Sequence, residues 1–341
     1  MRSFSFQRAN GAAEAVSEAA RISPSPELAQ TEAPTQFLAG GTTLLDLMKL
    51  DVMRPERLID INRLSARHGE IEVSGSSLRL GGLARMSDVA EHPAVRRDYP
   101  VIAQSLHSAA SPQLRNMATL SGNVLQRTRC PYFRDVTWNA CNKRNPGSGC
   151  AALEGINRRH AVLGVSDHCI AAYPGDFAQA LIALDATVEI LGSSGAMTLP
   201  FAELHREPGT TPHIETRLAP GALITAFTVP AGPWTRRSLY LKIRDRESYE
   251  FALASAAVAL DLKQGTVNGV RIALGGVATR PWRAHEAEDL LLGHPIDRAR
   301  AYEAARAAFA TAQPREGNRF KVELGRRTLV RALMQAAAME T

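Results

Sequence analysis

The sequence predicts a protein of about two domains in which helices and strands are mixed. Its 341 residues exceed one average domain. Apolar residues recur with strand spacing in some segments and helix spacing in others. A stretch rich in proline and glycine, at 208–233, is typical of a boundary region. The composition, 45% hydrophobic and 22% charged, is that of a packed globular protein and excludes a disordered or fibrous one.

The first 60 residues predict a strand, a helix, a strand, a Gly-Gly turn and a second helix, followed by a buried strand at Arg57–Ile61. The first strand alternates polar residues with phenylalanine, which indicates an edge strand rather than a signal-peptide core. Two short alternating runs, Ile71–Val73 and Leu78–Leu80, predict a hairpin. A helix and a turn of small residues, Ala118–Asn123, follow.

Residues 126–160 interrupt this pattern, because they hold few aliphatic residues and many Arg, Asn, Gly and Pro. A loop longer than about 15 residues is unusual in a compact domain, so we expect something other than an apolar core to hold it. The hydrophobic pattern resumes at 161. The last 110 or so residues predict two strands and three helices, at Leu239–Ile243, Val270–Leu274, 285–292, 297–312 and 320–338.

No segment is expected to span a membrane, and we expect a soluble protein. The longest apolar run, about Phe251–Leu260, is closed by Asp261. A helical span needs about 20 residues.

The Gly-Gly turn has the features of an anion site. Phe37-Leu38-Ala39 leads into Gly40-Gly41-Thr42-Thr43 and a helix that begins near Leu44. Glycine permits a close backbone approach, and the first N–H groups of a helix attract an anion. The threonine hydroxyls would add donors or cap the helix. An ordinary turn before a helix explains these residues about equally well.

A second turn, with Thr119, Gly122 and Asn123, has the same character. Two such turns suggest a long ligand with several negative charges, such as a dinucleotide. The chain has neither a G-x-G-x-x-G motif nor a Walker A motif, which disfavours the usual nucleotide-binding folds.

All four cysteines, Cys130, Cys141, Cys150 and Cys169, fall within 40 residues, separated by ten, eight and eighteen residues. The absence of a C-x-x-C motif argues against a zinc ribbon and a bacterial ferredoxin motif. Four thiolates are a full ligand set for an iron–sulfur cluster, and nearby Arg and Lys would favour its negative charge. Four unrelated buried thiols are the main alternative, and disulfides are a third.

The formal net charge of +6 is concentrated in the same region. Between Ser111 and His160 there are eight Lys or Arg and two Asp or Glu, so the remainder of the chain is neutral. We interpret this excess as compensation for a bound anion and a cluster. A nucleic-acid partner is disfavoured, because aromatic residues are only 6% of the chain and seldom alternate with basic ones.

With these motifs, the chain resembles the FAD-binding medium subunits of the molybdenum hydroxylases, the group of xanthine dehydrogenase and carbon monoxide dehydrogenase. The resemblance covers almost the whole chain and is strongest to the flavin and iron–sulfur subunit of bacterial periplasmic aldehyde oxidoreductases, which has the cysteine loop that most relatives lack. It is carried by Phe37–Lys49, Gln113–Thr119, Gln126–Phe133, Cys141–Arg144, Pro146–Gly155 and Lys242–Arg246.

This resemblance implies an α+β fold of the vanillyl-alcohol-oxidase type, with two subdomains that bind FAD (1–230), a [4Fe–4S] loop within 126–170, and a C-terminal α+β domain of the CO dehydrogenase flavoprotein type (231–341). It implies that all four cysteines ligate the [4Fe–4S] cluster. The implied FAD contacts are Phe37, Leu38, Ala39, Gly40, Gly41, Thr42, Thr43, Leu44, Thr119, Gly122, Asn123, Asp176, Ile224 and Lys242. A helix N-cap is the alternative role for Asp176, and a solvated strand position is the alternative for Lys242.

The resemblance also implies a heterotrimer, in which a large subunit carries the molybdenum cofactor and a small subunit carries two [2Fe–2S] clusters. FAD would receive electrons through these clusters and pass them to an external acceptor. No catalytic residue is expected in this chain. The alternative is a stand-alone FAD-dependent oxidase of the vanillyl-alcohol-oxidase type. We expect the complex in the periplasm if a partner carries an export signal, and in the cytoplasm otherwise.

Overall fold

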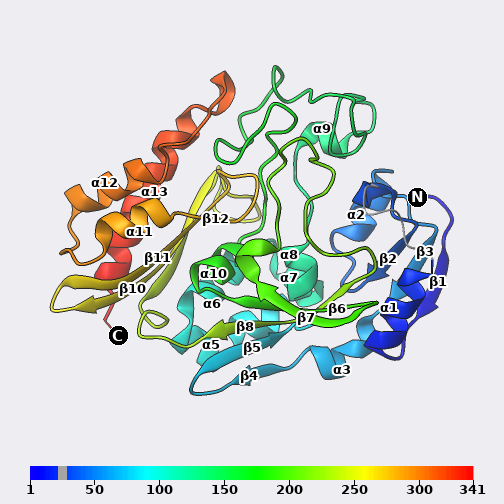
Figure 1. Ribbon diagram of the computed structural model, residues 1–341, viewed down its shortest axis with the longest axis horizontal. Helices are drawn as coiled ribbons and strands as arrows, with labels where there is room; N and C mark the ends of the chain where they lie inside the picture. Colours follow the sequence, from blue (N-terminus) through cyan, green and yellow to red (C-terminus); the bar gives the residue numbers. More distant parts are fainter. Residues whose placement is uncertain (22–28, 341) are drawn as a thin grey trace.

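Three sheets organise the chain in the computed structural model, which describes residues 1–21 and 29–340 (Figure 1). A three-stranded sheet at the N-terminus packs beside a five-stranded sheet. A four-stranded sheet with three helices forms the C-terminal part. The cysteine loop lies at the top of the view in Figure 1, between these parts. In the described ranges, no helix is long and apolar enough to cross a membrane.

The N-terminal sheet is parallel, with the strand order β1-β3-β2. Its strands and the helices between them are β1 (Ser5–Arg8), α1 (Ala12–Ala20), β2 (Thr35–Leu38), α2 (Leu44–Lys49) and β3 (Arg57–Asp60). Parallel strands cannot be joined by a tight turn, so each connection needs a crossover, here with a helix. This arrangement confirms the strand and helix order predicted for the first 60 residues, with β1 at the edge.

The second sheet is antiparallel, with the order β4-β5-β8-β6-β7. Its strands are β4 (Ile71–Val73), β5 (Ser77–Gly81), β6 (Thr187–Gly192), β7 (Gly195–Pro200) and β8 (Leu223–Pro230). Strands β4 and β5 form the predicted hairpin. Strand β8 lies in the middle of the sheet, although it comes from the stretch predicted as a boundary at 208–233. That prediction is wrong for β8, because alternate residues such as Phe227 and Val229 are buried in the core.

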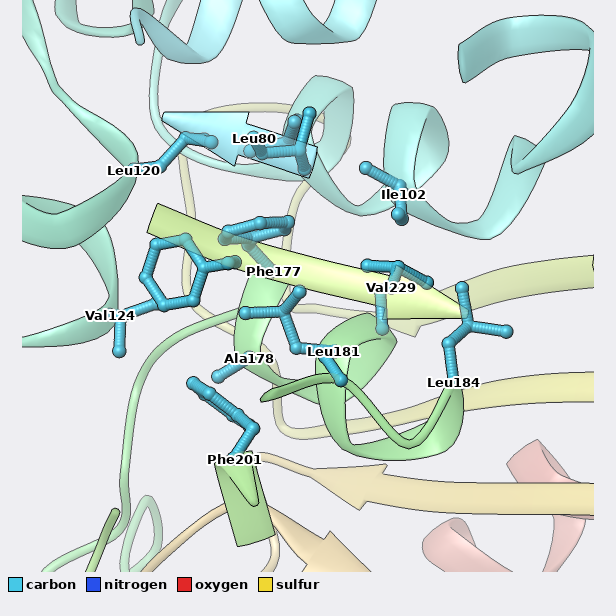
Figure 2. Close-up of a cluster of buried hydrophobic side chains, with 14 of the residues drawn as sticks. Leu80, Ile102, Leu120, Val124, Phe177, Ala178, Leu181, Leu184, Phe201 and Val229 are labelled. Carbon is cyan, nitrogen blue, oxygen red and sulfur yellow. The ribbon is translucent and has the colours of Figure 1, made fainter. Parts of the chain in front are cut away.

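Helices pack against this sheet to form the largest core cluster. They are α4 (Met86–Glu91), α5 (Pro93–Asp98), α6 (Pro100–Ser108), α8 (Leu120–Val124) and α10 (Phe177–Ala183). Helix α7 (Pro112–Met117) has no buried residue and packs against α4. Figure 2 shows Leu80 and Val229 of the sheet in one cluster with Ile102, Phe177 and Leu181 of the helices. The predicted turn at 118–123 is partly helical, since its last residues form the start of α8.

The C-terminal sheet is antiparallel, with the order β12-β11-β10-β9, and it carries three helices. Its elements are β9 (Ser238–Ile243), β10 (Ala254–Lys263), β11 (Thr266–Gly275), β12 (Trp282–Arg283), α11 (His285–Leu291), α12 (Arg298–Ala307) and α13 (Phe320–Ala337). These three helices confirm the helices that the sequence predicts at 285–292, 297–312 and 320–338.

Strand β10 explains the longest apolar run of the sequence. Ala256 and Val258 face the core of the C-terminal helices, whereas Ala257 and Ala259 face the core of α6 and α10. Both faces of the strand are covered, so its residues need not alternate between apolar and polar. The sequence pattern alone did not identify this strand.

The cysteine loop, residues 126–176, contains the short helix α9 (Pro131–Arg134). Tyr132 and Phe133 pack with Leu47 and Met48 of α2 in a small apolar cluster that also includes the cysteines. The prediction that no apolar core holds this loop is therefore wrong in this part.

A buried guanidinium supports the same loop. Arg144 donates hydrogen bonds to the carbonyl oxygens of Tyr132 (2.8 Å), Phe133 (2.7 Å) and Asp135 (3.2 Å), and it also contacts the carbonyl of Trp138. An unpaired buried carbonyl is costly. One side chain thus satisfies a group of carbonyls that no regular element pairs.

Candidate functional site

A cavity of about 650 Å³ lies where the two predicted turns meet. Its wall is completed by residues 205–224 and by part of the cysteine loop, including Arg127, Lys143 and Cys169. The volume falls within the range of natural ligand and cofactor pockets.

Most of the predicted FAD contacts line this cavity. The lining set comprises Phe37, Ala39, Gly40, Gly41, Thr42, Thr43, Leu44, Thr119, Gly122 and Ile224. Leu38, Asn123, Asp176 and Lys242 do not line it. Leu38 packs instead against the apolar cluster beside α2. The buried Asn123 Oδ1 has no hydrogen-bond partner among the described residues. The assignment of all these residues to FAD stays a prediction.

The first glycine of the Gly-Gly turn contacts the second turn. A Cβ built on Gly40 would lie 1.9 Å from the carbonyl oxygen of Met117 and 3.1 Å from Cα of Ala118. Gly41 has a φ of +72°, which disfavours any residue with a side chain. The glycines therefore serve two purposes, since one lets the two turns pack together and the other reverses the chain before α2.

Free amides make the first turn a suitable anion site. The backbone N–H groups of Thr42, Thr43 and Leu44 meet no acceptor among the described residues. Thr43 is the N-cap residue of α2, but its hydroxyl makes no capping hydrogen bond. Unpaired amides at a helix start attract a phosphate. In the second turn, by contrast, the hydroxyl of Thr119 accepts a hydrogen bond from the amide of Gly122 and caps α8.

Asn62 and Arg85, which the sequence patterns did not identify, connect the two turns by hydrogen bonds. Asn62 donates from Nδ2 to the carbonyl oxygen of Ala39 (3.0 Å) and to Asp60 Oδ1 (2.7 Å). Arg85 donates to Asn62 Oδ1 (3.1 Å) and also contacts the carbonyl of Met117. The series of hydrogen bonds through the side chains of Asp60, Asn62 and Arg85 therefore connects the backbone carbonyl groups of the two turns. No local motif marks these residues, because they act through contacts between distant segments.

Asp176 and Lys242 form a buried ion pair. Lys242 Nζ donates to Asp176 Oδ2 at 2.8 Å and to the carbonyl of Ser108 at 3.0 Å, while the hydroxyl of Tyr240 donates to Asp176 Oδ1 at 2.5 Å. Burial, followed by the charge of Asp176, raises the pKa of Tyr240 well above its ordinary value. The solvated role considered for Lys242 is wrong, because its side chain is 3% exposed. Asp176 is at the N-cap position of α10 but its side chain makes no capping hydrogen bond.

The four cysteines surround one small cavity of about 10 Å³. All four thiols are free, so the disulfide alternative is wrong for this structure. Burial raises the pKa of Cys130 to about 12, whereas a hydrogen bond with Cys169 is the main cause that lowers the pKa of Cys150 to about 7. Among residues 1–21 and 29–340, no group of three or more His, Cys, Asp or Glu side chains is already arranged around a metal position.

The basic excess of the loop is largely neutralised within the protein. Six of the eight cations between Ser111 and His160 pair with carboxylates outside that segment, namely Asp46, Glu215, Asp245 and Glu250. The interpretation of the whole excess as compensation for cofactors is therefore wrong. Only Arg127 and Lys143 of these paired cations line the large cavity.

Comparisons with known proteins agree with this geometry. Residues 5–232 match the FAD binding domain in molybdopterin dehydrogenase, and residues 239–341 match the CO dehydrogenase flavoprotein C-terminal domain. The chain is 47% identical over 339 residues to the aldehyde oxidoreductase FAD-binding subunit PaoB of Escherichia coli, with 99% of both chains covered. It is 28% identical to the carbon monoxide dehydrogenase medium chain of Hydrogenophaga pseudoflava, covering 91% of this chain and 92% of that one.

Solved structures show the same fold. A carbon monoxide dehydrogenase from Hydrogenophaga pseudoflava that lacks the Mo-pyranopterin moiety aligns with a TM-score of 0.75 at 26% identity, over 99% of this chain and 98% of that chain. The α+β fold with a flavoprotein-type C-terminal domain is thereby confirmed.

Proposed function

The chain belongs to the family of FAD-binding medium subunits of molybdenum hydroxylases, and on this premise we propose that it is the electron-transfer flavoprotein subunit of an aldehyde oxidoreductase complex. A large subunit with the molybdenum cofactor would oxidise the aldehyde. A small subunit with two [2Fe–2S] clusters would deliver the electrons to FAD in this chain, which would pass them to an external acceptor. The identity of 47% over the whole length of an aldehyde oxidoreductase subunit carries this proposal.

The residues of the large cavity fit FAD. The free amides of Thr42, Thr43 and Leu44 would hold the pyrophosphate, where the start of α2 favours negative charge. Gly40 keeps the second turn close enough for one ligand to contact both turns. When bound, FAD supplies the ability to exchange two electrons. The protein contributes binding, orientation and exclusion of water.

The test uses the purified complex and the isolated subunit. We expect the flavin spectrum of the complex to bleach on addition of aldehyde, and that of the isolated subunit to remain oxidised. Direct reduction of the isolated subunit by aldehyde would contradict the proposal. Oxygen consumption by the isolated subunit would favour the alternative, a stand-alone oxidase.

We also propose that the four cysteines hold a [4Fe–4S] cluster. The support is chemical, since four free thiols line one cavity in a loop that contains every cysteine of the chain. Iron and acid-labile sulfide should each be about four per chain. Cys141→Ser should lose this iron, whereas Thr137→Ala, an exposed change in the same loop, should keep it. Iron-free protein with intact flavin would refute the cluster. Export to the periplasm with a partner's signal stays a prediction that cell fractionation can test.

A further inference from the structure

Three charged side chains lie together in the wall of the large cavity. Lys143 Nζ is 2.7 Å from Glu215 Oε1, and Arg127 Nε pairs with Glu215 Oε2. Their side chains are 11%, 7% and 17% exposed for Lys143, Arg127 and Glu215. Lys143 also donates to the carbonyl of Pro212 at 3.0 Å. Two cations share one carboxylate, so this triad carries a net charge of +1.

One member of the triad, Lys143, lies between the two cavities. Lys143, Cys169 and Ala171 line both the large cavity and the cavity of the four cysteines. The guanidinium of Arg127 lies over the ring of Phe133, 5.3 Å from its centre, and Phe133 also lines the cysteine cavity. A single layer of residues thus separates the two spaces at Lys143, and Arg127 contacts the cysteine cavity through Phe133.

Two buried nitrogens of Arg127, Nε and Nη2, make no hydrogen bond within the described residues. Nε still faces Glu215 Oε2 in the ion pair, whereas Nη2 has no hydrogen-bond acceptor. A buried guanidinium nitrogen without an acceptor is costly, and Arg127 lines the large cavity. An acceptor atom of a bound ligand would satisfy it.

We propose that Arg127, Lys143 and Glu215 set the electrostatic potential at the bound flavin, with Arg127 Nη2 donating to the ligand and Glu215 acting as the positioning residue that holds both cations. This inference rests on FAD binding in the large cavity. A net positive charge in a wall of low dielectric constant stabilises the reduced flavin, which is more negative than the oxidised form. The triad therefore raises the reduction potential of the flavin.

Two substitutions with opposite effects on charge provide the test. Lys143→Met removes a cation and should lower the midpoint potential of the flavin, whereas Glu215→Gln removes the anion and should raise it. At a fixed redox potential of the solution, each substitution should change the equilibrium ratio of reduced to oxidised flavin by a factor on the order of ten. The potential is measured on the FAD-loaded complex by dye equilibration, without aldehyde, so failure here is separable from failure of the proposed function.

Matched variants complete the design. Lys143→Arg keeps the charge and should restore the wild-type potential. Glu288→Gln breaks the buried pair with Arg283 in the C-terminal part, away from both cavities, and should leave the potential unchanged. Shifts of the same sign in Lys143→Met and Glu215→Gln, or no shift in either, would overturn the proposal. If Glu215→Gln does not fold, the comparison of Lys143→Met with Lys143→Arg decides alone, because equal potentials in these two variants would refute an electrostatic role.

Discussion

Replacing Gly40 with alanine tests whether the close contact of the two turns creates the FAD site. The new Cβ would lie 1.9 Å from the carbonyl oxygen of Met117, 2.7 Å from its carbonyl carbon and 3.1 Å from Cα of Ala118. All three are backbone atoms, so no change of rotamer can relieve the clash. The φ of Gly40 is outside the left-handed region, so the effect is purely steric. The turns must separate by more than about 1 Å, and overpacking of this kind costs about 1–3 kcal/mol.

This separation should weaken FAD binding. It moves the amides at the start of α2 away from the second turn, so one ligand can no longer contact both. If the full cost falls on the bound state, the Kd for FAD rises by about 5- to 150-fold, since 1.4 kcal/mol is tenfold. The assay is titration of the deflavinated complex with FAD, followed by fluorescence.

The matched control is Gly75→Ala. A Cβ at Gly75, between β4 and β5, meets nothing within 4 Å, so this variant should bind FAD like the wild type. A Gly40→Ala variant whose Kd stays within about twofold of the Gly75→Ala value would refute the steric argument.

Three further predictions concern the surroundings of the site. Lys242→Met leaves Asp176 buried without its cation and should lower the free energy of unfolding by about 3–5 kcal/mol in denaturant titrations, with Lys242→Arg less affected. Asn62→Ala removes the donor to the carbonyl of Ala39 and should reduce FAD occupancy, whereas unchanged occupancy would exclude the bracing role. Burial alone would raise the pKa of Asp60, but hydrogen bonds from Asn62 and the pairing with Arg8 lower it. Its stabilisation is therefore present above the ordinary carboxylate pKa and lost as pH falls through the lowered pKa of the folded protein, and Asp60→Asn should flatten the acid limb of stability below about pH 4.

Much of the fold could be predicted from local patterns. The strands and helices of the first 60 residues, the hairpin and the three C-terminal helices all follow from periodicity and turn residues within one segment. Strand β10 was not predicted from the sequence, because both its faces are buried and its residues therefore lack the alternation of apolar and polar side chains that is typical of a strand. The position of β8 in the middle of its sheet was also not predicted, since the strands that pair with it lie far away in the sequence.

Some features of the candidate site could likewise be predicted from the sequence, and others could not. Sequence alone identified the Gly-Gly turn and the four cysteines, because glycine, small residues and thiols have local chemical meaning. Only the tertiary structure decided that Gly40 contacts the other turn, that Asp176 pairs with Lys242, and that Glu215 joins Arg127 and Lys143. The net charge of a segment is a property of its composition, but its neutralisation depends on which carboxylates folding brings within a few ångströms. Coulomb energies depend on distance in space rather than separation along the chain, so the partners of these charges could not be assigned before the fold was known.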